Sequence, residues 1–298
     1  MLVATVGIGS NSLRMLIAEI KGAQLRRVFR DRSGLRVFAA LDEYGNISAE
    51  MMERAAQSVL AFVDKAKAFQ AEKIHIFATS AVRDAKNQQA FCERIFEATG
   101  IALEVCSGEK EAMLSFLGAV ESERSGIIDI GGGSTEIVVG HGTEILCSKS
   151  LQMGAVRLFK QMPAGTAGEA YAVADHARAI LTPEIAAIQA RGDVHWVGVG
   201  GTFTTMAALL QGIPWTQKEL IHGYRISRDA VAQSIEWLAP LGIEERMLLK
   251  GLQPQRADIV VHGLAILLGC MQGLEIPEIM VSEYGNLEGY LKYRYEIQ

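Results

Sequence analysis

The amino-acid sequence predicts an α/β protein built from two related halves. First, a short apolar segment followed by a glycine loop occurs twice, because residues 6–12 (VGIGSNS) align with residues 128–134 (IDIGGGS) at a spacing of 122 positions. Second, strand-like and helix-like patterns alternate along 298 residues, 49% of them hydrophobic, which is enough for two cores. Two related half-molecules that face one ligand are therefore the first hypothesis.

The first half opens with three strands and continues with alternating helices and strands. The expected strands are residues 2–8, 13–20, 24–30, 73–78 and 102–106, and the expected helices are residues 49–69, 88–98 and 109–120. Ser48 is a suitable N-cap for the long first helix, and Gly100 ends the second.

The second half repeats this opening. The expected strands are residues 126–130, 135–140, 144–150 and 195–199, and the expected helices are residues 155–161, 167–190 and a segment from the glycine turn at 198–202 to residue 210. The remainder is mostly helical, with one more strand at 278–282 that leads to a final helix. The charged stretch 121–124 separates the repeats, which predicts domains at 1–123 and 124–298, with the last helix able to pack back on the first domain.

Composition excludes several classes of protein and site. A formal net charge of -5 argues against a generally basic nucleic-acid-binding surface. The four cysteines form no CxxC pair and the six histidines show no i, i+4 pair, so no zinc site or disulfide framework is expected. The N-terminus does not look like a signal peptide, and the apolar run at 259–271 is too short to span a bilayer. We expect a cytoplasmic protein with no nucleic-acid or membrane partner.

One basic cluster stands out against this acidic background. It comprises Lys21, Arg26, Arg27, Arg30, Arg32 and Arg36, opposed only by Asp31. Charges on an edge strand prevent pairing with other sheets, which is the structural interpretation. A track for an anionic ligand is the functional one, and both stay open.

The glycine loops are candidate phosphate-binding sites. Backbone N–H groups in a tight glycine turn can converge on one anion. The residues with this role are Gly131, Gly132, Gly133, Ser134 and Thr135, their counterparts Gly9, Ser10, Asn11 and Ser12, and the third turn Gly200, Gly201 and Thr202. Asp129 and Glu136 flank the second loop and could hold Mg²⁺ beside a phosphate. A single glycine loop is weak evidence, since ordinary strand turns also select glycine.

Two further side chains suit phosphate chemistry. Glu111 lies in the first turn of an expected helix, where it could orient water for attack on a terminal phosphate. Glu109, in the same turn, is explained by the helix dipole. Arg83 follows a strand end and could clamp phosphate oxygens, although a surface arginine is an equal alternative. The other candidate arginines are Arg14, Arg157 and Arg256.

With these residues assembled, the chain resembles the exopolyphosphatase and guanosine pentaphosphate phosphohydrolase (Ppx/GppA) family, in the actin, Hsp70 and sugar kinase superfamily. The segments that carry the resemblance span nearly the whole chain and are residues 9–14, 78–83, 107–112, 128–136, 153–157, 200–202, 256–258 and 282–285. The resemblance implies two RNase H-like, actin-like ATPase domains around a cleft, in the short form of the family, and suggests a homodimer. It implies Mg²⁺-dependent removal of the terminal phosphate of polyphosphate or guanosine pentaphosphate. In that pattern Glu111 is the catalytic glutamate, Asp129 and Glu136 are metal-side acids, and Arg83 and Arg14 contact phosphate.

Three positions depart from the family pattern. The first loop carries Gly7 in place of an acid, Lys110 replaces the acid before the catalytic glutamate, and Leu287 replaces an arginine. Loss of the acid at Gly7 should weaken Mg²⁺ binding, and a less negative site should favour a polyanion. Restoring an acid by Gly7→Asp is then expected to strengthen Mg²⁺ dependence.

Three functions remain as alternatives. The first is a phosphohydrolase acting on polyphosphate or a guanosine alarmone. The second is a non-catalytic or weakly active module that binds the same polyanions, which the departures favour. The third is a sugar or acid kinase, which the turn at 198–202 favours and the family-specific segments disfavour. Polyphosphate and alarmone share the terminal phosphoanhydride, so the sequence does not choose between them.

Overall fold

The computed structural model describes residues 1–120, 124–192 and 194–297. Its contacts divide the chain into two units. Unit 1 comprises Met1–Gly118 and Asn286–Gln298, and unit 2 comprises Ala119–Gly285. The predicted boundary at 121–124 lies mostly outside the described residues; its last member, Arg124, begins the first strand of unit 2. No helix in the described ranges combines the length and the apolar character needed to cross a membrane.

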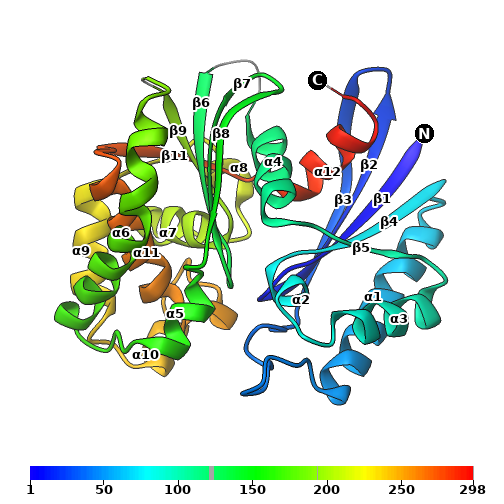
Figure 1. Cartoon of the computed structure of the whole chain (residues 1–298), viewed down its shortest axis with the longest axis horizontal. Coiled ribbons are helices and arrows are strands. Elements are labelled where there is room, and N and C mark those ends of the chain that lie inside the picture. Colours follow the sequence, from blue (N-terminus) through cyan, green and yellow to red (C-terminus); the bar gives the residue numbers. More distant parts are fainter. Residues whose placement is uncertain (121–123, 193, 298) are drawn as a thin grey trace. The chain divides into compact units, whose positions relative to one another are not determined.

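Unit 1 contains a mixed five-stranded sheet (Figure 1). Its elements are β1 (Leu2–Ile8), β2 (Ser12–Lys21), β3 (Gln24–Gly34), α1 (Ala49–Ala68), β4 (Lys73–Ala78), α2 (Ser80–Arg83), α3 (Gln88–Thr99), β5 (Leu103–Val105), α4 (Gly108–Ala119) and α12 (Asn286–Arg294). The strand order is β3-β2-β1-β4-β5; the first three strands are antiparallel neighbours, and β4 and β5 run parallel to β1. The expected elements are confirmed within one to four residues, and the short α2 was not predicted.

Local signals set the helix ends of unit 1. Ser48 accepts a hydrogen bond from the Met51 N–H at 3.2 Å, which confirms it as the N-cap of α1. Gly100 ends α3 in a left-handed conformation with φ of 71°, a geometry that glycine adopts without steric cost. Both caps satisfy backbone groups that a helix end would otherwise leave unpaired.

Helix α12 completes unit 1 although it comes last in the chain. Leu287, Tyr290 and Leu291 share one buried cluster with Val3 and Leu16 of the sheet. Gly289 permits this packing, because a Cβ there would lie 1.7 Å from the Leu114 carbonyl oxygen of α4. Helices α4 and α12 thus cover one face of the sheet, while α1 and α3 lie on the other (Figure 1).

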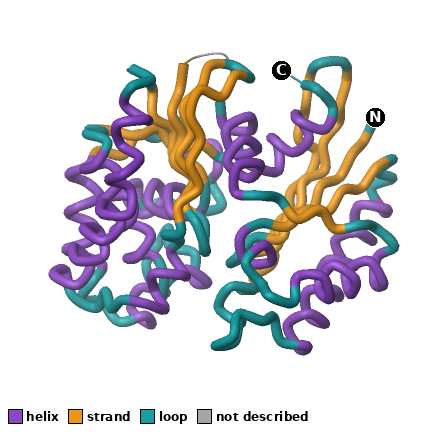
Figure 2. The backbone as a smooth tube through the Cα atoms, in the orientation of Figure 1, coloured by secondary structure: helices purple, strands orange, loops and turns teal. Residues whose placement is uncertain are grey.

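Unit 2 repeats the architecture with a six-stranded mixed sheet. Figure 2 colours its strands and helices separately. Its elements are β6 (Arg124–Ile130), β7 (Thr135–His141), β8 (Glu144–Leu151), α5 (Ala155–Gln161), α6 (Ala167–Gln189), β9 (His195–Val199), α7 (Gly201–Gln211), α8 (Lys218–Ile221), β10 (Arg225–Ser227), α9 (Arg228–Leu238), α10 (Ile243–Met247), the 3-10 helix η1 (Pro254–Arg256), α11 (Val260–Gly273) and β11 (Glu278–Ser282).

The strand order of unit 2 is β10-β11-β9-β6-β7-β8. Strands β6, β7 and β8 are antiparallel neighbours, and β9 and β11 continue the sheet in parallel, which is the arrangement of β1 to β5. Two related α/β halves are thereby confirmed. The expectation of a single strand after residue 210 was wrong, because strand β10 precedes β11. Strand β10 has only three residues, too few for a sequence pattern, and antiparallel pairing with β11 holds it in place.

The helices of unit 2 pack around α11, whose residues from Val260 to Met271 are all buried. Gly269 brings α11 against α6, because a Cβ there would lie 2.3 Å from the Ala174 carbonyl oxygen. Helix α6 begins with a capping box between Thr166 and Glu169. A largely apolar helix such as α11 is stable in water only when it is surrounded in this way.

Candidate functional site

The glycine loop of unit 2, residues 131–134, turns its carbonyl groups toward α5. Gly131 O accepts from the Ala155 N–H at 2.9 Å, and Gly132 O accepts from the Val156 and Arg157 N–H groups at 2.9 and 3.0 Å. Gly154 makes this approach possible, because a Cβ there would lie 2.3 Å from the Gly132 carbonyl carbon.

This anchoring fixes where the loop N–H groups point. In a trans peptide the N–H is directed opposite to the carbonyl of the preceding residue, and the described chain contains no cis peptide. The N–H groups of Gly132 and Gly133 therefore point away from α5. The Ser134 N–H points the same way, because the preceding carbonyl, Gly133 O, accepts from Arg157 Nε at 2.6 Å. Three successive N–H groups of this kind form an anion-binding nest.

The loop of unit 1, residues 9–12, has the same construction. The Gly9 N–H donates to Ser12 O at 3.0 Å, as the Gly131 N–H donates to Ser134 O at 3.0 Å. Ser10 O and Asn11 O accept from the backbone of residues 38 and 36, at 3.0 and 3.1 Å. The N–H groups that follow these carbonyls are again turned away, so the sequence repeat is a repeat of loop geometry.

Asp129 and Glu136 lie directly opposite each other on β6 and β7. Glu136 is fully buried and accepts a hydrogen bond from Ser150 Oγ at 2.8 Å. Gly200, with φ of 97°, sits so close that a Cβ would lie 2.9 Å from Asp129 Oδ1. Two adjacent carboxylates fit Mg²⁺, which keeps several waters and takes one or two protein carboxylates. The described residues contain no cluster of three or more histidine, cysteine, aspartate or glutamate side chains for a metal.

The equivalent pair in unit 1 is Gly7 and Arg14, which are opposite on β1 and β2. Arg14 Nη2 donates to Asn286 Oδ1 at 3.0 Å. A Cβ at Gly7 would lie 2.9 Å from Phe77 Cζ and 3.0 Å from Leu287 Cδ2. Two of the three departures from the family pattern, at positions 7 and 287, therefore lie against each other, and an apolar contact takes the place of two charged positions.

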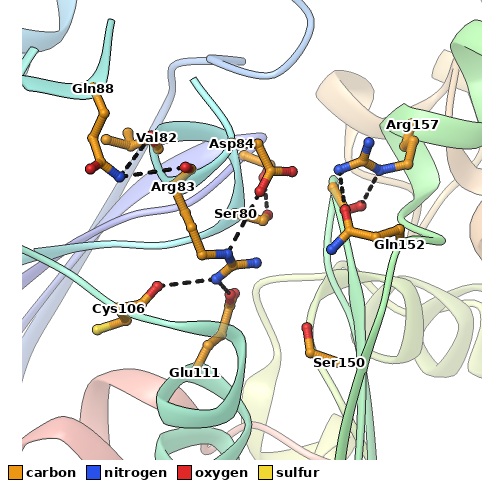
Figure 3. Close-up of polar contacts among 12 residues, drawn as sticks. Ser80, Val82, Arg83, Asp84, Gln88, Cys106, Glu111, Ser150, Gln152 and Arg157 are labelled. Atoms are coloured by element: carbon orange, nitrogen blue, oxygen red, sulfur yellow. Dashed lines mark hydrogen bonds and ion pairs between the residues drawn. The ribbon is translucent and has the colours of Figure 1, made fainter. Parts of the chain in front are cut away.

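Glu111 and Arg83 form an ion pair within unit 1 (Figure 3). Arg83 Nη1 donates to Glu111 Oε2 at 2.8 Å and to Cys106 O at 3.1 Å. Arg83 Nη2 is buried and has no hydrogen-bond partner among the described residues. Glu111 is 6% exposed in the first turn of α4, where the helix dipole favours its carboxylate. Burial raises the pKa of the Cys106 thiol to about 12, which favours the protonated form.

Ser80 connects this ion pair to the first glycine loop. Its Oγ lies 2.7 Å from Ser10 Oγ, and both side chains are buried. Helix α2 thus joins the loop at one end and carries Arg83 at the other. Ser80 lies in the segment 78–83 that carries the family resemblance, but its contact with Ser10 was not predicted. No sequence pattern had marked Ser150 or Asn286, because each matters only through a partner distant in the chain.

Lys110, the third departure, is occupied by neighbours in unit 1. Its ammonium pairs with Glu104 and lies 4.8 Å from the centre of the Tyr293 ring. Tyr290 OH also donates to Glu104, at 2.8 Å. Burial opposes ionisation of Glu104, but hydrogen bonds from Lys110 and Tyr290 lower its pKa overall. The positive charge is therefore compensated where α4 meets α12.

The third glycine turn begins α7 in unit 2. A Cβ at Gly201 would lie 1.9 Å from the guanidinium carbon of Arg256, so that group rests against the first residue of the helix. Thr202 is buried beside Gly263. The turn therefore brings together four neighbours: Asp129, Gly200, Gly201 and Arg256. Arg256, which the sequence offered only as one candidate arginine among several, is part of the candidate site.

The basic cluster divides into separate environments. Strand β3 is a sheet edge. Arg26 pairs with Glu19 at 2.7 Å, and Arg27 pairs with the buried Glu288 at 2.7 Å. For these two arginines the structural interpretation holds. Arg36, by contrast, lies at the first glycine loop.

Comparison with known proteins identifies the family. The Ppx/GppA phosphatase family matches residues 16–295. Exopolyphosphatase 2 of Mycobacterium tuberculosis (strain H37Rv) is 31% identical over 96% of both chains. A guanosine-5'-triphosphate,3'-diphosphate pyrophosphatase of Vibrio vulnificus is 29% identical over 97% of this chain, which spans 58% of that relative.

Solved structures agree with this assignment. An Aquifex aeolicus PPX-GPPA enzyme is 28% identical with a TM-score of 0.82, and the match covers 98% of both chains. An exopolyphosphatase from Cytophaga hutchinsonii is 26% identical with a TM-score of 0.89, covering 100% of this chain and 99% of the other. The chain belongs to the Ppx/GppA phosphatase family.

Proposed function

We propose that the protein hydrolyses the terminal phosphoanhydride of a linear polyanion, inorganic polyphosphate or guanosine pentaphosphate. The observation that carries the proposal is the Arg83–Glu111 pair, in which Nη1 of Arg83 holds the carboxylate, Nε lies 3.7 Å from Asp84 Oδ1, and Nη2 is buried without a hydrogen-bond partner among the described residues. A phosphate oxygen is the natural acceptor for Nη2.

The proposed reaction is attack by water on the terminal phosphorus, with Glu111 as the general base. Glu111 accepts a proton from a water molecule, the water oxygen bonds to the terminal phosphorus, and the phosphoanhydride P–O bond breaks. The shortened chain leaves with the bridging oxygen. Positioning and charge stabilisation are the main requirements of such a transfer. In unit 1, the N–H groups of the loop at 9–12 and the guanidinium of Arg83 would supply donors to phosphate oxygens. In unit 2, the loop at 131–134 offers N–H donors of the same kind.

Asp129 and Glu136 would hold Mg²⁺ in unit 2. When bound, the ion neutralises charge on the phosphate oxygens. Their register on β6 and β7 and the hydrogen bond from Ser150 support this role. Asp129→Asn should lower the affinity for Mg²⁺, measured by isothermal titration. Asp175→Asn is the control, because Asp175 is an exposed acid on α6 that pairs with Arg178.

The test is phosphate release from long-chain polyphosphate and from guanosine pentaphosphate, with Mg²⁺ and with EDTA. Release that needs Mg²⁺ and is lost in Glu111→Gln supports the proposal, and the preferred substrate is read from kcat/KM. Contamination is excluded if the Glu111→Gln protein, purified identically, is inactive.

A binding protein for the same polyanions is the second candidate. The apolar contact between Gly7 and Leu287 favours it, because two charged positions of the family pattern are missing together. Tight binding of polyphosphate without any phosphate release in Mg²⁺ would support this candidate and contradict the proposed hydrolysis.

A further inference from the structure

Helix α10 (Ile243–Met247) of unit 2 has its charged and apolar residues in inverted positions. Of its five residues, all of them described, only Arg246 is buried, at 5% exposure. Ile243 and Met247 are 48% and 47% exposed. Leu248, which follows the helix, is 87% exposed, the highest value of any large hydrophobic side chain in the described ranges. A surface helix normally buries its apolar residues and exposes its charged ones.

The side chain of Arg246 shows how this helix is held in place. Its guanidinium donates to Leu238 O and Ala239 O at 3.0 Å each, and to Ala257 O at 3.2 Å. Leu238 and Ala239 form the end of helix α9 (Arg228–Leu238), and arginine is a usual partner for the last carbonyl groups of a helix. Helix α10 is thus attached by hydrogen bonds, and its apolar side chains remain on the outside.

The same contacts place a fourth exposed apolar residue near α10. Trp237 is 47% exposed and directly precedes Leu238, whose carbonyl Arg246 holds. Single exposed hydrophobic residues are normal on a protein surface, which is the structural interpretation. Four of them between residues 237 and 248, around one polar anchor, are more typical of an interaction site. We call these residues the α10 surface: Trp237, Ile243, Met247 and Leu248.

Charges beside the α10 surface indicate what covers it. Glu244 lies in the first turn of α10 and Lys250 lies beyond its end. Both are exposed, and neither forms a salt bridge with any described residue. If two copies of this surface meet about a two-fold axis with their helices antiparallel, Glu244 of each copy comes near Lys250 of the other. The surface is therefore self-complementary in charge.

The other classes of occupant fit these charges less well. An anionic lipid surface would be repelled by Glu244, by the neighbouring Glu245 and by the formal net charge of -5. A foreign protein with a basic apolar face would leave Lys250 opposite a like charge. A second copy satisfies both signs at once, and two-fold pairing of identical surfaces is the commonest form of protein assembly.

We infer that two copies of this chain associate through the α10 surface, with Glu244 of each copy paired with Lys250 of the other. The inference goes beyond the proposed function and uses no residue of the candidate site. A specific interface buries about 800 Å² per partner, and the four apolar side chains would form its centre inside a polar rim. Because that centre is small, we expect a dimer that forms in a concentration-dependent manner.

The experiment measures self-association by analytical ultracentrifugation from about 1 to 100 μM, which covers weak specific interfaces. Leu248→Glu removes the most exposed apolar contact and should raise the dimer Kd about tenfold or more. Leu220→Glu is the matched control, because Leu220 is a 55% exposed leucine on helix α8 of the same unit; its Kd should stay within about twofold of the parent value. Circular dichroism checks that both variants are folded.

A charge exchange tests the pairing itself. Glu244→Lys and Lys250→Glu should each raise the dimer Kd by about three- to tenfold, because each places like charges together in two symmetric contacts. The double variant should recover most of the parent affinity, since the pair is restored with its direction reversed. If these charges served only the dipole of α10, all three variants would dimerise as the parent does.

Three results would overturn the inference. Equal Kd values for Leu248→Glu, Leu220→Glu and the parent would place any dimer interface elsewhere. Lack of recovery in the double variant would exclude the pairing of Glu244 with Lys250. A parent protein that stays monomeric would exclude a second copy as the occupant; sedimentation with phosphatidylserine vesicles would then indicate a lipid surface, and no sedimentation a foreign protein.

Discussion

At the scale of single residues, position 7 shows how sequence comparison and geometry give different expectations. A missing acid suggests that Gly7→Asp would restore metal dependence. The structure shows Phe77 and Leu287 where the new Cβ would stand. Gly7 and Leu287 therefore belong together: an apolar contact between them stands where the family pattern has two charged residues.

Gly7→Asp is therefore expected to destabilise unit 1. Overpacking of this kind costs about 1–3 kcal/mol, and removing the new carboxylate from water adds to it. Urea unfolding monitored by circular dichroism gives the free energy. The double variant Gly7→Asp with Leu287→Ala should recover part of the loss from overpacking; equal stability of Gly7→Asp and the parent protein would contradict the contact.

Glu111→Gln is expected to lower kcat by about 10²- to 10⁴-fold, the usual contribution of a general base. The amide oxygen can still accept from Arg83, so KM should change little. Glu109→Gln is the matched control, because Glu109 lies exposed in the same helical turn. Steady-state phosphate release measures both variants, and equal kcat for them would remove Glu111 from the mechanism.

The sequence indicated candidate site residues more readily than the partners that hold them in place. Several residues are recognisable because each lies in a short segment with a chemically specific pattern. They are the glycine loops, Asp129, Glu136, Glu111 and Arg83. The roles of Ser150 and Asn286 were not predictable, since each depends on a contact across strands or with α12.

At the scale of elements, α5 links the glycine loop to the helical layer of unit 2. Its N-terminus donates to the loop carbonyls. At its C-terminal end, Met162 O lies 2.9 Å from His262 Nε2 of α11. The position of the loop therefore depends on a hydrogen bond at the far end of a seven-residue helix.

This link predicts a pH dependence of stability. Burial lowers the pKa of His262 below 6.5; the hydrogen bond to Met162 and the charge of Asp258 oppose this shift, and Arg246 adds to it. A lowered histidine pKa means that the unfolded chain binds more protons, so stability falls as pH drops below about 6.5. The slope from this group cannot exceed about 1.4 kcal/mol per pH unit.

Urea unfolding between pH 7.5 and 5.5 tests this expectation. His262→Gln keeps a donor for Met162 O and removes the titration, so its stability should vary less with pH than that of the parent protein. Part of the slope should remain, because burial also lowers the pKa of His75 in unit 1. Identical slopes for the two proteins would exclude His262 as the titrating group.

Most elements were predictable because their length exceeds one period of their hydrophobic pattern. The twenty residues of α1 and the alternating residues of β1 and β2 are examples. Strand β10 and helix α2 have three and four residues. Pairing with β11 and contact with the first loop, respectively, hold them in place, and neither partner can be found from local sequence.

At the scale of the whole molecule, two units share one strand order but treat their equivalent positions differently. Unit 2 has Asp129 opposite Glu136, and unit 1 has Gly7 opposite Arg14. The same pair of strand positions thus holds two carboxylates in unit 2 and one arginine in unit 1. The sequence repeat predicted the common framework, and the substitution at position 7 marked the difference.

Gly289→Ala should destabilise unit 1 selectively. The added methyl would lie 1.7 Å from Leu114 O and 2.9 Å from Gly118 N, so α12 must move from α4 at a cost of roughly 3 kcal/mol or more. Hydrogen exchange read by mass spectrometry should show faster exchange in β1 to β5 and unchanged protection in α6 and α11.

Gly168→Ala provides the control for this substitution. A Cβ at Gly168 meets nothing within 4 Å, and alanine is the better helix former by about 0.5–1 kcal/mol. The control should therefore be at least as stable as the parent protein. Equal loss of protection in both units after Gly289→Ala would show that the units unfold together.

The membership of α12 in unit 1 also orders events during synthesis. The face of the sheet formed by Val3, Leu16 and Ala18 is covered by a helix that the ribosome makes only after unit 2. Unit 2 can then fold while α4 alone is present to cover that face of the earlier sheet. We therefore expect the usual order, in which the N-terminal domain folds first, to be reversed here. A nascent chain stalled before residue 286 would hold one finished unit and one open sheet that invites chaperone binding.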